Sequence, residues 1–243
     1  MNQSVGKRAL VTGGSRGIGR AIVERLVSDG YSVVFTWHKN QRAADSVVNA
    51  GKNRVKAVQA DLSVEEEALA TAQKMKAYGP FNVLVCNATN DTSVSSIENM
   101  SLESWAQSLT IFATAPFLLI KHLAPEMPRG SAIINISSLN TLLPQAGIAG
   151  YCAGKSALES LTQVAAKELA PRDITVNAVR PGVTDTEGQR AVNPDPAARE
   201  QIAQMIPMGR LGQPEEIAEV VSFFAGPQSR WVTGQILTAS GGM

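Results

Sequence analysis

Three polar residues in the middle of the chain have the types and spacing that acid–base chemistry needs. Tyr151 and Lys155 are four residues apart in a segment, 149–170, whose apolar pattern predicts a helix, so both side chains lie on one face. A tyrosine with a pKa of about 10 is a weak acid at neutral pH, but a cation about 5.5 Å away lowers that pKa by about 2 at an effective dielectric of 20. Tyr151 can then protonate a carbonyl oxygen while Ser138, at the end of a predicted strand, steadies the same oxygen.

A Tyr-x3-Lys pair alone is most often a surface contact, so the elements around it decide its meaning. Short continuous apolar runs, typical of parallel strands buried on both faces, alternate with helical patterns along the whole chain. The expected fold class is α/β: a single domain, 1–243, with a doubly wound, seven-stranded parallel sheet and helices on both faces. We expect strands at 8–13, 32–37, 54–60, 82–88, 132–138, 174–180 and 235–240, and helices at 17–29, 41–50, 64–77, 101–126, 149–170 and 214–225.

One long segment, about 183–208, lacks a regular pattern apart from a short helical patch at 196–205. A connection of that length is usually a lid or a binding loop, so we expect it to choose the substrate.

Composition excludes several classes of protein. The chain has 44% hydrophobic and 18% charged residues, and its formal charge of +1 comes from 22 basic and 21 acidic side chains without a basic run. We therefore expect neither a nucleic-acid partner nor a membrane partner. Cys86 and Cys152 lack a metal-like spacing, and no signal peptide or apolar run of membrane length is apparent. These features indicate a soluble protein in the reducing cytoplasm, without a metal site.

A glycine-rich loop follows the first predicted strand. In VTGGSRGIGRAI, Gly13, Gly17 and Gly19 lie where a strand turns into a helix, so the backbone can approach a pyrophosphate and the helix N-terminus faces its charge. Three glycines alone are a weak signal. Their position between a strand and a helix of the first βαβ unit makes an ordinary turn a poor explanation.

The end of the second predicted strand bears on which dinucleotide binds. Chains that bind NAD place an acidic residue there, but this chain has FTWHKN and no carboxylate before Asp45. A 2′-phosphate would meet no like charge and could pair with Arg16 or Lys39, which favours NADP(H) over NAD(H). Both side chains could also be ordinary solvated charges. Asp61, after the third strand, either accepts from the adenine amino group or caps the next helix.

These motifs together resemble the short-chain dehydrogenase/reductase family over essentially all of the chain. The resemblance rests on TGGSRGIG (12–19), Asn87-Ala88, Ser138 with YCAGK, RPGVTDT (180–186) and the C-terminal VTGQILTASGG. It implies a Rossmann sheet, a homotetramer or homodimer built on the helices at 101–126 and 149–170, and hydride transfer between a nicotinamide and a carbonyl or alcohol.

The resemblance also assigns roles to single residues. Ser138, Tyr151 and Lys155 are the expected catalytic set, with Lys155 also binding the nicotinamide ribose, Asn87 bracing the fourth strand, and Thr186 contacting the carboxamide or phosphates. The residues expected to bind the cofactor are Gly13, Ser15, Arg16, Gly17, Ile18, Gly19, His38, Lys39, Asp61, Leu62, Asn87, Ala88, Tyr151, Lys155, Pro181, Gly182 and Thr186.

Within that family, the segments 167–182 and 208–224 and the terminal GGM resemble the bacterial 3-oxoacyl-[acyl-carrier-protein] reductases. Those enzymes dock an acidic carrier helix on basic residues near the active-site entrance, and Arg129 and Arg172 match such positions. The two arginines could equally be solvated. The expected function is NADPH-dependent reduction of a 3-oxoacyl thioester in acyl-chain synthesis. The second choice is a small free alcohol or ketone.

Three positions depart from the family pattern: Thr89 replaces a glycine, Ser240 precedes the terminal Gly-Gly, and Phe112 lies where a catalytic asparagine is expected, seven residues after Trp105. One interpretation of Phe112 is a non-catalytic NADP(H)-binding sensor or assembly subunit. The other uses Pro116, which has no N–H for the Phe112 carbonyl, so we hypothesise that this carbonyl holds the relay water instead. Pro116 could also only bend the helix around the core.

Overall fold

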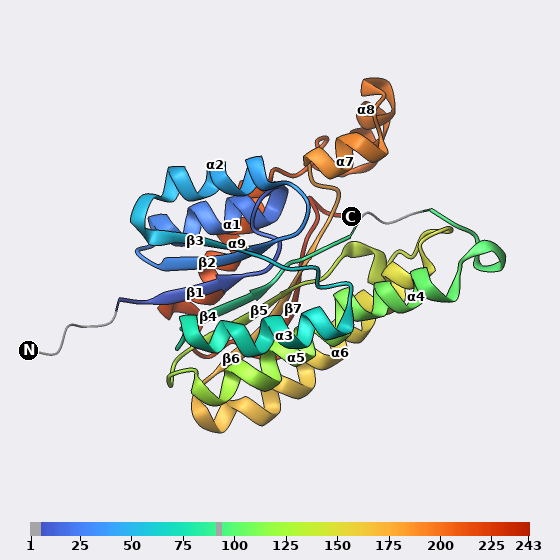
Figure 1. Ribbon diagram of the computed structural model, residues 1–243. Helices are drawn as coiled ribbons and strands as arrows, with labels where there is room; N and C mark the ends of the chain where they lie inside the picture. Colours follow the sequence, from blue (N-terminus) through green and yellow to red (C-terminus); the bar gives the residue numbers. More distant parts are fainter. Residues whose placement is uncertain (1–5, 91–93) are drawn as a thin grey trace, which may run out of the picture.

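The computed structural model describes residues 6–90 and 94–243, and it forms a parallel sheet between two layers of helices (Figure 1). The sheet has seven strands in the order β3-β2-β1-β4-β5-β6-β7, and each neighbouring pair is parallel. The expected α/β class is therefore confirmed. The strands are β1 (Arg8–Val11), β2 (Ser32–Trp37), β3 (Val55–Gln59), β4 (Val83–Cys86), β5 (Ala132–Ile136), β6 (Thr175–Pro181) and β7 (Ile236–Ala239).

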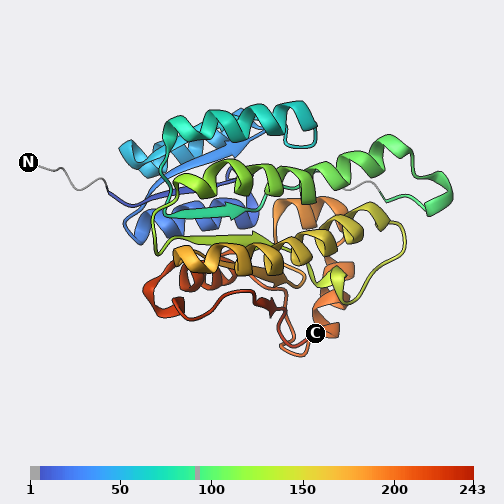
Figure 2. The same cartoon turned by 90° about the horizontal axis from the view of Figure 1, so that it is seen from below.

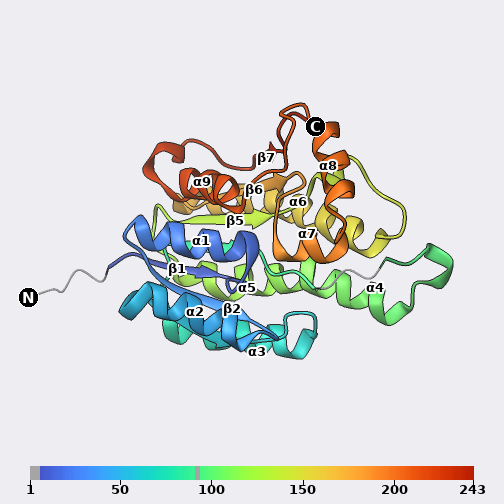
Figure 3. The same cartoon turned by 90° about the horizontal axis from the view of Figure 1, so that it is seen from above.

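The helices divide between the two faces of the sheet. Figure 3 shows α1, α2 and α9 over one face, and Figure 2 shows α3, α5 and α6 over the other. The helices are α1 (Gly17–Ser28), α2 (Gln41–Gly51), α3 (Glu65–Met75), α4 (Leu102–Leu109), α5 (Ala115–Leu123), α6 (Ala149–Leu169), α7 (Glu187–Val192), α8 (Pro196–Met205) and α9 (Pro214–Ala225).

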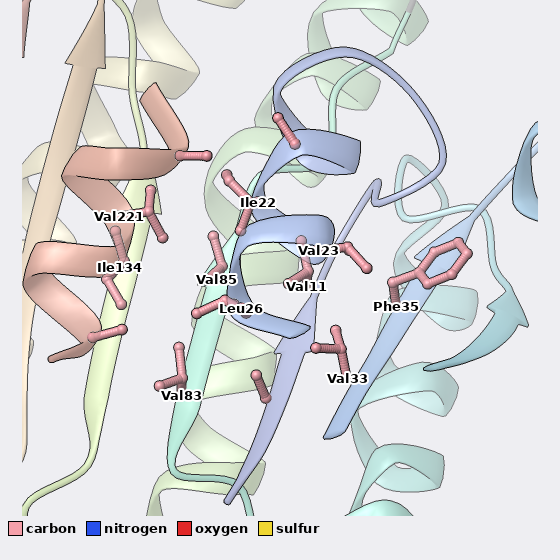
Figure 4. Close-up of a cluster of buried hydrophobic side chains, with 14 of the residues drawn as sticks. Val11, Ile22, Val23, Leu26, Val33, Phe35, Val83, Val85, Ile134 and Val221 are labelled. Carbon is pink, nitrogen blue, oxygen red and sulfur yellow. The ribbon is translucent and has the colours of Figure 1, made fainter. Parts of the chain in front are cut away.

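Strand residues alternate between two apolar cores. Val11, Val33 and Val85 contribute to the cluster under α1 and α9, which Figure 4 shows together with Ile22 and Leu26. Their neighbours along the strands, including Leu10, Val34 and Leu84, belong to the cluster under α3, α5 and α6. Because successive side chains point to opposite faces and both faces are covered, the strands read as continuous apolar runs.

The strand order places a crevice at the carboxyl ends of β1 and β4. β1 pairs with β2 on one side and with β4 on the other, so the chain winds in opposite directions from this point. Ligands of open α/β sheets bind where the winding reverses, outside the carboxyl ends of the strands. The glycine-rich loop follows β1, and Asn87 follows β4, so both lie at this crevice.

The helix expected at 101–126 is not one regular α-helix. A π-helical turn, Thr110–Thr114, separates α4 from α5, and the Ala115 amide donates to the Thr110 carbonyl five residues earlier. Pro116 is the second residue after this turn, and without an N–H it cannot donate to either the Ile111 or the Phe112 carbonyl. A change of helical register is the usual way to accommodate such a loss.

By length and composition alone, Leu102–Glu126 is also apolar enough to cross a membrane. Its packing explains this apolar character. The helix contacts α6 and α3, and Phe112, Leu119 and Leu123 are buried against them. Core helices of soluble proteins pass the same test.

The connection at 183–208 contains two helices where one was expected. α8 coincides with the patch at 196–205, but α7 was not predicted from the sequence. Thr186 is the N-cap of α7, and its hydroxyl accepts from the Gln189 amide. Figure 1 shows both helices standing apart from the helical layers, at the end of the sheet that also carries α4.

Candidate active site

Ser138, Tyr151 and Lys155 meet at the carboxyl end of β5. Ser138 follows this strand and caps a short 3-10 turn by accepting from the Asn140 amide at 3.2 Å. Tyr151 and Lys155 project from the first turns of α6, and the Ser138 side chain lies close enough to the Tyr151 phenol to lower its pKa. The Lys155 Nζ lies 5.8 Å from the centroid of the Tyr151 ring, as the four-residue spacing predicted.

The expected effect of Lys155 on Tyr151 is wrong for this structure. Burial raises the pKa of the Tyr151 phenol above its usual value, and the nearby Ser138 side chain offsets only part of that rise. Lys155 supplies little compensation, because burial lowers its own pKa to about 7, so that it is only partly charged at neutral pH. The distance was predicted well, but the desolvation of both groups was not.

The Lys155 side chain crosses a dry region to reach the backbone of β5. Its Nζ donates to the Ile136 carbonyl at 2.6 Å, and the residue is 3% exposed. Burial has the largest effect on its pKa, and the Glu159 carboxylate opposes it. Burial raises the pKa of the Cys86 thiol to about 12, so this thiol is neutral and supplies no counter-charge at physiological pH.

A buried ionic network that the sequence analysis missed lies behind Ser138. The Glu159 carboxylate accepts from Ser137 Oγ at 2.6 Å, from Thr141 Oγ1 at 2.8 Å, and from Arg180 Nη2 and Nε at 2.7 and 3.0 Å. Burial acts to raise the pKa of Glu159, but these hydrogen bonds and the Arg180 charge outweigh it and lower the pKa. The network fixes the residues on both sides of Ser138 to α6 and β6. The sequence motif that contains Arg180 was noted, but its pairing with Glu159 was not predicted because the two residues are 21 positions apart in the chain.

The glycine-rich loop lies against the end of β4. Gly13 has a φ of +68°, and a Cβ at Gly19 would lie 2.1 Å from the Gly13 carbonyl oxygen. Asn87 Nδ2 donates to the Thr12 and Gly13 carbonyls at 2.9 and 3.2 Å, while Thr12 Oγ1 accepts from the Asn87 and Ala88 amides at 2.9 Å. Asn87, which was expected to brace the fourth strand, thus ties the end of β4 to the glycine-rich loop, and Thr12 is a further bracing residue that was not predicted.

These features fit a bound dinucleotide phosphate. Arg16 is the N-cap residue of α1, and its side chain makes no capping hydrogen bond, so the first amides of this 12-residue helix have no side-chain acceptor from the cap. Exposed amides at a helix N-terminus bind anions. A Cβ at Gly17, where φ is +50°, would lie 3.2 Å from Thr186 Cγ2, so the start of the 183–208 segment closes over the loop.

The end of β2 carries the residues expected to choose between NADP(H) and NAD(H). His38 and Lys39 are exposed there, as is Arg16 across the loop. His38 Nε2 lies 3.3 Å from Asp61 Oδ2, and Asp61 Oδ1 accepts from the Ser63 amide and hydroxyl at 3.0 and 2.6 Å. Asp61 therefore closes a turn after β3, and Val64, not Asp61, is the N-cap of α3.

The other expected cofactor residues surround the same crevice. Ser15 and Leu62 are buried, Ile18 packs on the core under α1, and Pro181 ends β6. Gly182 approaches the end of β7 so closely that a Cβ would lie 2.7 Å from Ser240 Cα.

Arg129 and Arg172 do not lie near the entrance of this chain's site, which corrects the expectation for them. They precede β5 and β6, at the amino ends of the strands, whereas Ser138 follows the carboxyl end of β5. Arg172 donates to the carbonyls of residues 124, 125 and 127 at 2.6, 3.2 and 2.8 Å, and Arg129 pairs with Asp173. Both guanidinium groups thus stabilise the loops at the amino ends of the strands, opposite the end that carries Ser138.

Comparison with known proteins agrees with this geometry. A family model described as "Enoyl-(Acyl carrier protein) reductase" matches residues 13–243. The 3-oxoacyl-[acyl-carrier-protein] reductase FabG of Staphylococcus aureus (strain Mu50 / ATCC 700699) is 35% identical over 243 residues, covering 98% of each protein. The cyclic-di-GMP-binding biofilm dispersal mediator protein of Escherichia coli (strain K12) is 35% identical over 242 residues, covering 99% of this chain and 98% of that protein.

Among solved structures, the angucycline C-6 ketoreductase LanV with bound NADP matches with a TM-score of 0.88 and 33% identity, covering 97% of this chain and 95% of LanV. The fold, the residues at the crevice and these full-length matches define an α/β oxidoreductase. The chain belongs to the short-chain dehydrogenase/reductase family.

Proposed function

We propose that this protein is an NADPH-dependent carbonyl reductase in which Tyr151 is the general acid. The observation that carries the proposal is that Ser138, Tyr151 and Lys155 converge at the carboxyl end of β5, at the crevice beside the uncapped N-terminus of α1. LanV, whose structure contains NADP, supports the cofactor assignment, as does the exposed Arg16. The 2′-phosphate would lie near Arg16 and the end of β2.

The residues at the site have distinct roles in this proposal. A bound reduced nicotinamide supplies the hydride that the carbonyl carbon accepts. Tyr151 donates its phenolic proton to the carbonyl oxygen, so that a ketone becomes an alcohol, and Ser138 donates a hydrogen bond to the same oxygen. Because the pKa of the Tyr151 phenol is raised, the phenol holds its proton at neutral pH but is a weaker acid than the spacing to Lys155 predicted.

The first substrate class is a 3-oxoacyl thioester. The full-length similarity to the staphylococcal 3-oxoacyl-[acyl-carrier-protein] reductase supports this class. The positions of Arg129 and Arg172 weaken the part of the proposal that concerns carrier docking, because both serve local structure far from the site. We therefore expect the acyl thioester, and not the carrier protein, to provide most of the recognition within one chain.

A free apolar ketone is the second substrate class, and the surface around Ser138 favours it. Leu142 and Leu143, just after the Ser138 turn, are 56% and 52% exposed. Val94 is also exposed and packs against Gly147, four residues before Tyr151, and Met208 is exposed at the end of the 183–208 segment. An apolar border of this kind suits a hydrophobic substrate. The likeness to the ketoreductase LanV agrees.

Steady-state oxidation of NADPH would separate these possibilities. The substrates would be an acetoacetyl thioester, the same acyl group on an acyl carrier protein, a 2-enoyl thioester, and aliphatic and aromatic ketones. Tyr151→Phe should abolish turnover and leave NADPH binding intact, which ties turnover to the phenol. Micromolar NADPH binding without turnover of any substrate would refute the proposal and favour a binding protein, the class to which the E. coli relative's name points.

A further inference from the structure

The Phe112 ring lies between the two residues proposed to perform the proton chemistry. The Lys155 Nζ is 4.6 Å from the centroid of this ring, closer than to the Tyr151 ring. The Phe112 and Tyr151 rings meet edge to face, with centroids 5.0 Å apart and planes at 81°. One aromatic side chain thus contacts both Lys155 and Tyr151, at a position where the family resemblance expects an asparagine.

An ammonium in this environment has few ways to offset its burial. The Ile136 carbonyl accepts one of its three hydrogens. The titratable groups that face it are the Cys86 thiol from β4, the Tyr151 phenol and the Glu159 carboxylate from α6. The thiol is neutral, the phenol is protonated, and the carboxylate is already paired with Arg180.

The ring face offers the remaining attraction. An aromatic face carries negative potential, and a cation within about 6 Å of the centroid is attracted most strongly where water is excluded. Phe112 is 1% exposed, and the space beside it is a cavity of about 10 Å³, room for about one water, lined by Phe112, Lys155 and Pro116 among others. Bulk water therefore cannot replace the ring.

The fold holds this ring in place from two sides. Phe112 belongs to the π-helical turn, whose extra residue changes the direction of the side chains within it. On α6, Gly154 lets the two helices approach, since a Cβ there would lie 2.8 Å from the Phe112 Cβ and 3.1 Å from the Ser108 carbonyl oxygen. The π-helical turn and the close approach of α6 therefore restrict the position of the ring from two sides.

We propose that Phe112 is a positioning residue whose ring face binds the Lys155 ammonium and holds it beside Tyr151. An aromatic face thereby does for the lysine what a polar side chain would otherwise do. The consequence for reaction rests on the proposed function, but the contact with Lys155 does not.

The test compares Phe112→Leu, which removes the aromatic face, with Phe112→Tyr, which keeps it. Protein labelled with ¹³C-lysine gives the titration of Lys155 by NMR, with the signal assigned from Lys155→Met. We expect the pKa of Lys155 to fall by about one pH unit or more in Phe112→Leu and to change little in Phe112→Tyr. Turnover at pH 7 should fall about tenfold or more in the leucine variant, with the alkaline limb of kcat/KM moved to lower pH.

Phe81→Leu is the matched control, because Phe81 is equally buried just before the amino end of β4, away from Lys155. It should lower thermal stability as Phe112→Leu does without moving the Lys155 titration. If Phe112→Leu does not fold, fluorinated phenylalanines at position 112 keep the volume and weaken the ring face stepwise. The pKa of Lys155 should then fall with each fluorine.

An unchanged Lys155 titration in Phe112→Leu, or across the fluorinated series, would overturn the proposal and leave the ring a packing role. If the titration moves but no carbonyl substrate is turned over, this proposal stands and the proposed function fails.

Discussion

Replacing Glu159 with glutamine removes one charge from the buried network behind Ser138 while keeping the size of the side chain. The side chains of Glu159 and Arg180 are each 11% exposed, and the carboxylate accepts four hydrogen bonds. In Glu159→Gln the Arg180 guanidinium loses its counter-charge. The glutamine amide can also point its N–H groups at those of Arg180, where no hydrogen bond can form. Removing one partner of a buried ion pair costs about 3–5 kcal/mol.

That loss is large beside the free energy of unfolding of a typical domain, about 5–15 kcal/mol. We expect urea unfolding at pH 7 to show a decrease of about 3 kcal/mol or more in Glu159→Gln. The same substitution at Glu216 is the control, because its pair with Arg210 is exposed and glutamine can keep the hydrogen bond to the Gln213 amide. Glu216→Gln should lower the free energy of unfolding by about 1 kcal/mol or less, because solvent screens its pair with Arg210.

The pH dependence provides a second measurement. The pKa of Glu159 is lower in the folded protein than in the unfolded chain, so its contribution to stability is complete above the unfolded pKa of about 4.3. That contribution is lost as the pH falls through the folded value. The difference in unfolding free energy between the wild type and Glu159→Gln should therefore shrink as the pH is lowered from 7 to below 4.

Two results would refute this reasoning. One is a loss at pH 7 no larger than that of Glu216→Gln, and the other is a difference that does not depend on pH. Because Ser137 and Thr141 lie on either side of Ser138, the proposed catalytic serine, turnover should also fall in Glu159→Gln while NADPH binding stays intact. The double variant Glu159→Leu/Arg180→Met should recover much of the stability, since apolar replacement of a buried pair is often neutral.

Three further substitutions test other parts of the site. Arg16→Ala should raise the KM for NADPH about tenfold or more and leave that for NADH unchanged, because only NADPH carries the 2′-phosphate; equal changes for both would contradict the assignment. Arg172→Ala should lower the free energy of unfolding by about 1–3 kcal/mol through its lost carbonyl contacts, with an unchanged ratio of kcat/KM for carrier-bound and free thioesters. Pro116→Ala restores an N–H that can donate to the Phe112 carbonyl. We therefore expect the π turn to revert to α geometry in a crystal structure and turnover to fall. Unchanged turnover would exclude a relay water on that carbonyl.

The sheet and the crevice could be predicted because local patterns determine them. Continuous apolar runs that alternate with helical periods leave few topologies, and right-handed crossovers then place the loop after β1 beside the end of β4. Gly13 has a positive φ, and Gly19 approaches another backbone segment, both of which a glycine motif signals directly. Ser138, Tyr151 and Lys155 follow from one strand end and one helical spacing.

The missed features depend on contacts between distant segments. Glu159 and Arg180 look like unrelated surface charges until α6 packs beside β6. Arg129 and Arg172 matched a docking pattern, but their distance from the entrance depends on which ends of β5 and β6 they occupy. The pKa of Tyr151 depends on burial, which no sequence spacing reports.

Phe112 shows most clearly how packing and chemistry share the same residues here. Gly150 and Gly154 lie one helical turn apart on α6, and a Cβ at either would lie within 3 Å of the facing helix, at Ser108 or Phe112. Tyr151 follows Gly150 and Lys155 follows Gly154. The two glycines against which the facing helix packs therefore lie next to the two residues of the proposed proton chemistry. A larger residue at position 150 or 154 would push the facing helix, and with it the Phe112 ring, away from Tyr151 and Lys155. The segment that carries the proposed catalytic pair therefore also specifies a helix contact, and Phe112 lies within that contact.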